Sequence, residues 1–163
     1  MSDPEILFGI YCPPHPQPLL TPEASEGYGR LRDAFETCRK RIEESEADLI
    51  LVYSTTWPSI IGHQIQGHPE PEWVHVDDDF HYLSSMPYKF KMDTEFAEKF
   101  RECAESRGLQ SRTVAYDGFP IDTGSIVALK LLNPDNRIPA CIVSSNMYAN
   151  SCLLYTSPSP RDV

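Results

Sequence analysis

Several features that would assign the chain to a large functional class are missing from its 163 residues. Positive charge is scarce, because 14 lysine and arginine residues stand against 24 aspartate and glutamate residues and give a formal net charge of −10. Such a surface repels nucleic acid and anionic membranes, so we expect neither as a partner. No apolar run approaches the roughly 20 residues that cross a bilayer. No basic-then-apolar leader opens the chain. We therefore expect a cytoplasmic protein.

Paired cysteines and the common catalytic motifs are missing as well. The five cysteines show no CxxC pair and no regular spacing, and three of them lie in apolar segments. We expect them to be reduced, small core residues rather than disulfides or zinc ligands. No glycine-rich phosphate loop, nucleophile elbow or Ser-His-Asp order occurs in the chain. Nucleotide-binding and hydrolase functions therefore have little support.

Apolar segments of strand length alternate with helical patterns, which favours an α/β fold. Residues 6–12 and 49–53 are apolar runs that predict buried strands, and a helix is expected between them from Thr21 to about Ser45. A strand, a helix and a strand of these lengths form a βαβ unit, in which the two strands are parallel neighbours. Their ends, near Pro13 and Ser54, are then expected to open on the same edge of the sheet.

The remaining segments continue this alternation. The sequence predicts a short helix ending at Gly67, a helix over residues 93–108 that Asp93 begins, and an apolar helix over residues 125–132 that Asp122 caps. Further strands are expected at residues 73–76, 113–116 and 140–144.

The last residues differ from the rest of the chain. Ser151 to Asp162 follow the last expected strand abruptly and show neither helical nor strand periodicity. Cys152 to Asp162 resemble the conceptual translation of a sequencing adapter, although a genuine proline-rich tail is the alternative. We therefore expect residues 1–151 to be the N-terminal part of a single domain that is truncated at its C-terminal side, and residues 152–163 to be a non-native tail.

Histidine is the residue type that points to metal chemistry. His15 lies among prolines that stiffen the backbone just past the first expected strand, where ligands gather in open α/β sheets. Two histidines and one carboxylate suit non-haem Fe(II), since they leave positions open for substrate and O₂. On spacing alone, a loop histidine without function is an equal interpretation for His15. Surface or supporting roles are favoured for three others: His63, His68 and His81.

Several stretches together resemble a known family in their residues and in their order. They are the strand ending in His15, Leu49–Ser54 followed by Thr55-Thr56-Trp57, His75-Val76-Asp77 with His81, Tyr116-Asp117-Gly118-Phe119-Pro120-Ile121-Asp122-Thr123-Gly124, and Val143-Ser144-Ser145-Asn146. Through these stretches, residues 6–147 resemble the class III (LigB-like) extradiol ring-cleavage dioxygenases. Within that family they resemble the subunits of the members that open 2-aminophenol, and especially the α subunit. The resemblance implies a mixed, largely parallel central sheet flanked by helices.

In that family two histidines and a glutamate hold a ferrous ion. The resemblance implies that His15 is the first ligand. The family pattern puts the second histidine near Thr56, where this chain has none, so His63 is a weak substitute. The glutamate and the main acid–base histidine of the family come later than the matching stretches. Three further residues are candidates either for the substrate pocket or for purely structural roles: His75, Tyr116 and Asp122.

The resemblance implies two functions. The first is an Fe(II) enzyme that opens a catechol or 2-aminophenol ring with O₂, together with a homologous subunit. The second is an iron-free homologous subunit that binds and stabilises a catalytic partner. Thr55-Thr56-Trp57 favours the second function and the retention of His15 favours the first. A peptide- or metal-binding module on the same fold is a weaker third alternative. In each case we expect the 163-residue fragment itself to be inactive.

Overall fold

A four-stranded sheet forms the centre of the computed structural model, which describes residues 5–148. The strand order is β1–β6–β2–β5; β1 pairs with β6 and β2 with β5 in parallel, whereas β2 joins β6 in antiparallel orientation. The strands are β1 (Ile50–Ser59), β2 (His63–Gln66), β5 (Ser111–Val114) and β6 (Ala140–Asn146). The expected α/β class with a mixed, mostly parallel sheet is confirmed. The tail expected at residues 152–163 lies outside the described residues.

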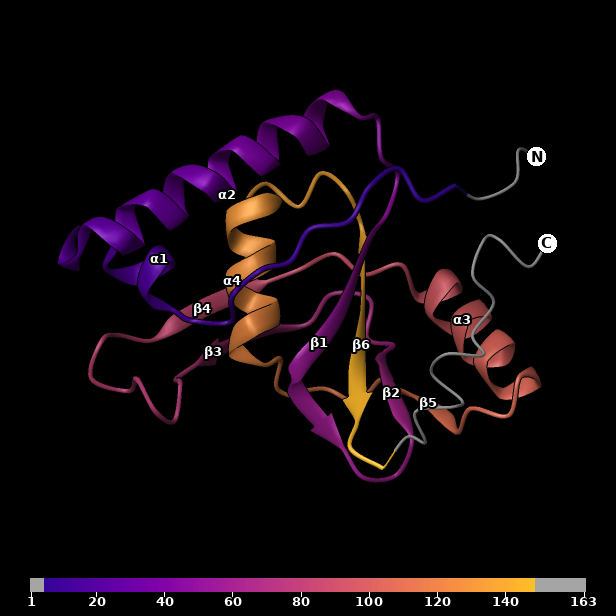
Figure 1. Cartoon of the computed structure of the whole chain (residues 1–163). Coiled ribbons are helices and arrows are strands. Elements are labelled where there is room, and N and C mark those ends of the chain that lie inside the picture. Colours follow the sequence, from indigo (N-terminus) through magenta and orange to yellow (C-terminus); the bar gives the residue numbers. More distant parts are fainter. Residues whose placement is uncertain (1–4, 149–163) are drawn as a thin grey trace.

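Helices lie on both sides of this sheet (Figure 1). On one side, α4 (Thr123–Leu132) packs against β1, and α2 (Glu26–Glu44) packs against α4. On the other side, α3 (Thr94–Ser106) packs against β2, β5 and β6. A separate antiparallel pair is formed by β3 (Glu72–His75) and β4 (Met86–Lys89). Among the described residues, no helix has the length and apolarity that a membrane span requires.

The helix α4 is the centre of the larger hydrophobic core. Eight of its ten residues are buried, and Ile126 and Val127 have no exposed surface. A helix that is apolar all round is buried on every side, and α4 accordingly lies between the sheet and α2. Its predicted position and its Asp122 cap are both confirmed, since the Asp122 side chain accepts a hydrogen bond from the Ser125 amide. The end of α4 that faces β1 is therefore held in place by both packing and capping.

The prediction of a strand at residues 6–12 is wrong. Residues 5–15 form neither helix nor strand, and Tyr11 is 94% exposed, while Phe8 and Cys12 rest on the core. The apolar run satisfies strand propensity, but the choice of a pairing partner depends on tertiary context. Among the described residues, β1 pairs with β6 instead, so the expected βαβ unit with two neighbouring parallel strands does not form.

Two helix predictions also need correction. The helix expected to end at Gly67 is instead the strand β2, because so short an apolar run fits either period. Gly62, with φ of +95°, admits the Gln110 backbone so closely that the His63 amide donates to the Gln110 carbonyl at 2.8 Å. The long helix expected from Thr21 begins only at Glu26, after a separate 3₁₀ turn, η1 (Pro22–Ala24).

The other elements are close to their predicted positions, with two omissions, β4 and the short helix α1 (Gln17–Leu20). Asp93 caps α3 by accepting from the Phe96 amide at 2.8 Å, as expected. The strand expected at residues 113–116 begins two residues earlier, and β4 was not predicted. No disulfide links the four described cysteines. Burial raises the pKa of Cys141 to about 12, whereas Cys103 is exposed on α3 rather than in the core.

Candidate functional site

Asp122 connects the beginning of α4 to the end of β1. Its carboxylate accepts hydrogen bonds from the Ser54 hydroxyl at 2.8 Å and from the Thr56 hydroxyl at 2.6 Å. It also accepts from the amide and the hydroxyl of Ser125, at 2.9 and 2.8 Å. A carboxylate at a helix N-terminus is stabilised by the N–H groups and the dipole that it faces. With four donors, Asp122 is a structural connection between the irregular second half of β1 and α4.

A second carboxylate, that of Asp77, is hydrogen-bonded to Thr123, the residue that follows Asp122 at the start of α4. Thr123 is buried; its hydroxyl donates a short hydrogen bond to Asp77 and lies 2.9 Å from Nε2 of His75. Asp77 also accepts from the amides of Asp79 and Phe80, at 3.0 and 2.9 Å. Burial raises the pKa of Asp77, but these hydrogen bonds and the nearby His75 outweigh it and lower the pKa below its usual value. The turn after β3 is thereby attached to α4.

The loop that carries His15 meets these two carboxylate clusters. The exposed His15 ring lies edge-on to Phe80, with ring centroids 6.0 Å apart. Pro14 lies so near α4 that a Cβ atom at Gly124 would be 3.0 Å from the Pro14 Cβ, and the same Cβ would overlap the Thr56 hydroxyl. Three segments therefore converge on the N-terminus of α4: the segment before α1 (Gln17–Leu20), the second half of β1 and the turn after β3.

His63 lies at the same end of the sheet but on its other face. It is 4% exposed and its Nδ1 is 3.0 Å from the Ser144 carbonyl. Because a carbonyl only accepts, Nδ1 carries the proton and the Nε2 lone pair is left. Nε2 is buried and has no hydrogen-bond partner among the described residues. Metal-binding histidines commonly have this arrangement, with one ring nitrogen donating to a carbonyl and the other facing the metal.

The predicted metal ligands are not gathered into a complete site within residues 5–148, where no three His, Cys, Asp or Glu side chains are arranged to hold a metal. His63 and Ile65 alternate with Gln64 along β2, and Ile65 packs on the α3 side of the sheet with Val143. His15 instead lies beside the α4 side. Both are near the end of the sheet where β1 and β6 finish.

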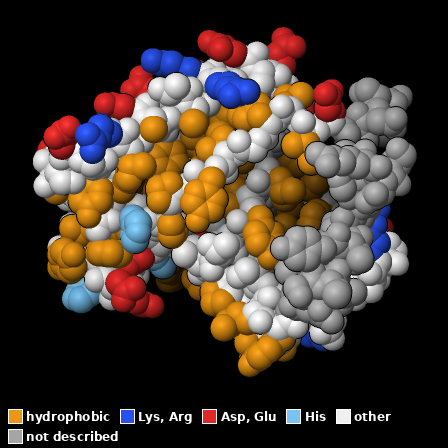
Figure 2. Space-filling view, viewed as in Figure 1, with side chains coloured by type: hydrophobic (Ala, Val, Ile, Leu, Met, Phe, Trp, Pro, Cys, Tyr) orange, Lys and Arg blue, Asp and Glu red, His pale blue; other side chains and the backbone are white. Residues whose placement is uncertain are grey.

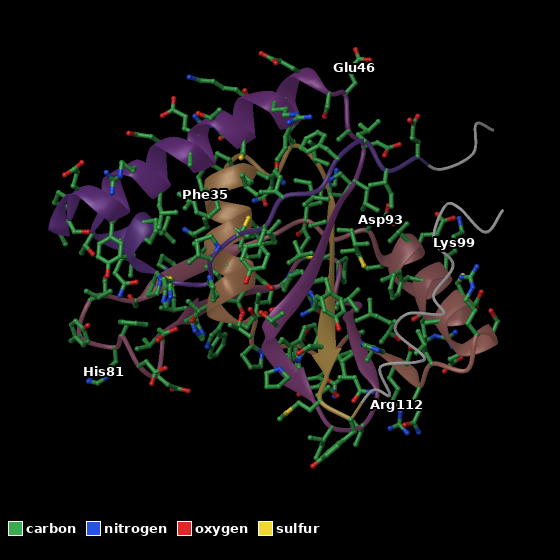
Figure 3. The ribbon with its side chains drawn as sticks, in the orientation of Figure 1. Phe35, Glu46, His81, Asp93, Lys99 and Arg112 are labelled. Atoms are coloured by element: carbon green, nitrogen blue, oxygen red, sulfur yellow. The ribbon has the colours of Figure 1, made fainter. Side chains whose placement is uncertain are left out.

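Aromatic side chains place Tyr116 at the border of the site. Trp57, which follows Thr56, packs on Phe119 with ring centroids 5.4 Å apart, and Phe119 packs on Tyr116 at 5.2 Å. Tyr116 is 62% exposed. The histidines judged to have supporting or surface roles are peripheral. His68 contacts the exposed Asp117, and His81 projects from the turn after β3 (Figure 3).

Sequence reasoning identified Asp122 and His75 but missed the residues that join them to the rest of the site. Ser54 and Thr123 supply the connecting hydroxyls, and Asp77 supplies the second carboxylate. Thr123 directly follows the predicted cap and Asp77 follows His75 by two residues. These proximities were the available signal, but a contact between residues 46 positions apart needs the folded structure.

A family model described as the catalytic LigB subunit of aromatic ring-opening dioxygenase matches residues 9–161. The chain belongs to the LigB family. The resemblance found in the sequence is thereby confirmed at the level of the family. The helices and the mixed sheet described above are the LigB-type fold that this membership predicts.

Three curated proteins illustrate the relationship. The chain is 28% identical over 144 residues to the 2-aminophenol 1,6-dioxygenase alpha subunit of Pseudomonas sp, which covers 88% of the chain and 53% of that protein. It is 30% identical over 154 residues to the beta subunit, covering 90% and 50%. It is 22% identical over 114 residues to 3,4-dihydroxyphenylacetate 2,3-dioxygenase of Escherichia coli, covering 69% and 41%. The chain thus spans about half the length of these LigB relatives.

Proposed function

We propose that the chain belongs to a subunit of an Fe(II) extradiol dioxygenase that opens the ring of a catechol or a 2-aminophenol with O₂. The observation that carries the proposal is the state of His63. Its Nδ1 is fixed by the Ser144 carbonyl, and its Nε2 lone pair is buried without a partner among the described residues. An unpaired buried acceptor costs free energy, and a cation that binds there removes the cost. His63 therefore fits the ferrous ion that the family implies.

In this proposal the two predicted histidine ligands are His63, on the α3 face of the sheet, and His15, beside the α4 face at the same sheet end, so the ion has to lie across that end. The third ligand, a glutamate in the family, comes from the half of the relatives' length that this chain does not span. When bound, Fe(II) would supply chelation of two vicinal oxygen or nitrogen atoms of the substrate and a binding position for O₂. The chain itself supplies the positioning: His63 is held by β6, and the His15 loop is held against α4. Tyr116, His75 and Asp122 lie around the same sheet end and are proposed to border the substrate pocket.

The full-length protein tests the proposal through anaerobic Fe(II) titration, with bound iron measured after gel filtration. We expect one Fe(II) per subunit and loss of this iron in His63→Gln and in His15→Ala. His81→Gln is the matched control, because the His81 side chain is exposed, lies against Tyr82 and the Asp78 carbonyl, and is not one of the proposed ligands. Addition of 2-aminophenol and then of O₂ should produce the ring-opened product, followed by its absorbance. Unchanged iron in both His63→Gln and His15→Ala would overturn the proposed ligands.

A specific observation favours the iron-free subunit as a second candidate. Thr56, where the family pattern places a histidine, has its hydroxyl committed to Asp122 at 2.6 Å. In that case the full-length protein binds no stoichiometric iron, and His15→Ala changes nothing in the metal analysis. Mixing it with the homologous catalytic subunit should instead raise the partner's thermal stability. Ring opening by the protein alone would exclude this candidate and also the binding-module alternative. Turnover by the 163-residue chain alone would show that the chain is not a truncated part.

A further inference from the structure

The hydrogen-bond chain through Thr123 has a defined direction. A threonine hydroxyl has one proton, and a carboxylate only accepts, so Thr123 donates to Asp77. The remaining contact of that hydroxyl, 2.9 Å from Nε2 of His75, must then be donated by the imidazole. Asp77 stays ionised because Thr123 and two backbone amides lower its pKa more than burial raises it. The order is therefore His75 to Thr123 to Asp77, and the neutral imidazole carries its proton on Nε2.

The other ring nitrogen of His75 is consequently a proton acceptor. Nδ1 has a lone pair in this tautomer, and none of the described residues hydrogen-bonds to it. His75 is half-buried. The described residues include three side-chain atoms that are buried without a hydrogen-bond partner, and Nδ1 of His75 is not one of them. The backbone of His75 is fixed by pairing of β3 with β4, opposite Met86. The ring is thus held at both its backbone and its Nε2, while Nδ1 remains open to a ligand.

This acceptor belongs to the same group of residues as the proposed site. Thr123 is flanked by Asp122, which binds the end of β1, and by Gly124, against which the His15 loop packs. Asp77 holds the amide of Phe80, whose ring contacts His15. His75 is therefore joined through Thr123 and Asp77 to both the Asp122 cluster and the turn whose Phe80 lies against His15.

We propose that His75 accepts, through Nδ1, a proton from a hydroxyl or amino group of the aromatic ligand, and that Thr123 and Asp77 are positioning residues for it. The identity of the ligand rests on the proposed function. In the step, the ligand O–H or N–H bond breaks, its electron pair stays on the ligand, and the proton adds to Nδ1. The imidazolium that forms keeps its Nε2 proton on Thr123 and is stabilised by the negative charge of Asp77. Return of the proton to product or solvent restores the neutral ring.

The first test is independent of ring opening and uses nitrogen-15 NMR of the full-length protein in alkaline solution, where an imidazole is neutral. We expect an unprotonated Nδ1 and a solvent-protected proton on Nε2 of His75. Thr123→Val should lose the protected proton, whereas Thr123→Ser should keep it, because serine retains the hydroxyl. His68, whose Nε2 contacts Asp117 at 2.9 Å, is the internal control and should not change. A proton on Nδ1 in the wild type, or an unchanged Nε2 proton in Thr123→Val, would overturn the proposal.

The second test uses the full-length protein with its homologous subunit. We expect His75→Gln to lower kcat for ring opening by about 10²-fold or more, with a much smaller change in KM. Thr123→Val should lower kcat less, and Thr123→Ser should restore it. An unchanged kcat in His75→Gln would overturn the role of His75 and leave the proposed function intact. If the wild type opens no ring, the proposed function fails. The present inference then still expects catechol to shift the Nδ1 signal of His75. An unshifted signal would overturn the present inference as well.

Discussion

The two faces of the central sheet differ in how completely they are packed. On the α4 side, one cluster contains fifteen buried hydrophobic residues, whereas the cluster under α3 contains four. On β1, the side chains of Leu51 and Tyr53 lie on the α3 side and are 50% and 52% exposed. Hydrophobic side chains line a hollow beside β1 and β6 (Figure 2). The two carboxylate clusters therefore lie on the well-packed face, and His63 lies on the thinly covered one.

Removal of buried volume from the α4 face should have the largest effect on stability. Leu129→Ala empties space around a residue that is 1% exposed, and we expect the free energy of unfolding to fall by about 2–5 kcal/mol. Urea unfolding followed by circular dichroism measures the change. Leu51→Ala, which removes the same atoms from the half-exposed position on β1, is the matched control and should cost less than half as much. Equal losses would show that the two faces are equally packed.

The caps of α4 and α3, Asp122 and Asp93, allow a second comparison of the two faces of the sheet. Asp122→Ala removes a cap and also the acceptor of the Ser54 and Thr56 hydroxyls, so we expect a loss of about 2–3 kcal/mol. Asp93→Ala removes a cap that accepts from the Phe96 amide, and about 1 kcal/mol is expected. Thermal unfolding of both variants gives the ratio. A larger loss for Asp93→Ala would mean that the hydroxyl contacts of Asp122 contribute nothing.

A smaller effect should appear as a dependence of stability on pH at the β3 turn. The folded state lowers the pKa of Asp77, so the ionised carboxylate stabilises the fold above its unfolded pKa, which is about 3.9. That contribution is lost as the pH falls through the lowered, folded pKa. The stability difference between wild type and Asp77→Asn should therefore be constant near neutral pH and shrink below about pH 4. Unfolding curves at several pH values measure it, and a difference that grows on acidification would contradict the assignment.

The smallest effect is expected for a polar substitution on the open part of the sheet. Leu51→Thr keeps a side chain that suits a strand at a position that is already half exposed, so the free energy of unfolding should change by no more than about 0.5 kcal/mol. Denaturant titration detects a change of this size if the transition slope is unchanged. A loss above 2 kcal/mol would mean that the α3 face is covered in solution.

The sequence was sufficient where the decisive interactions are local. Asp122 and the apolar run after it predict α4 and its cap, because the donor and acceptor are three residues apart. Residues 6–12 also have a clear local pattern, yet they form no strand, because the parallel partner of β1 is β6, which lies nearly ninety residues further along the chain. Pairing between distant segments is set by the whole fold and has no short-range signal.

The candidate site shows the same limit. His15, His75 and Asp122 could be selected from the sequence, as residue types and through the family resemblance. The bond from Thr56 to Asp122 and the bridge from His75 through Thr123 could not, since each joins segments at least 46 residues apart. The state of His63 was equally hidden, because the Ser144 carbonyl that fixes its ring comes from β6.

Gly124 gives the site a steric control that is separate from its polar groups. Because the space beside its Cα is filled by the Thr56 hydroxyl and the Pro14 ring, one additional methyl group there would press the end of β1 and the His15 loop away from α4. The distance between those loops is therefore set by the smallest residue in the helix. A larger residue at position 124 would therefore change the spacing of these segments while every hydrogen-bonding side chain keeps its identity.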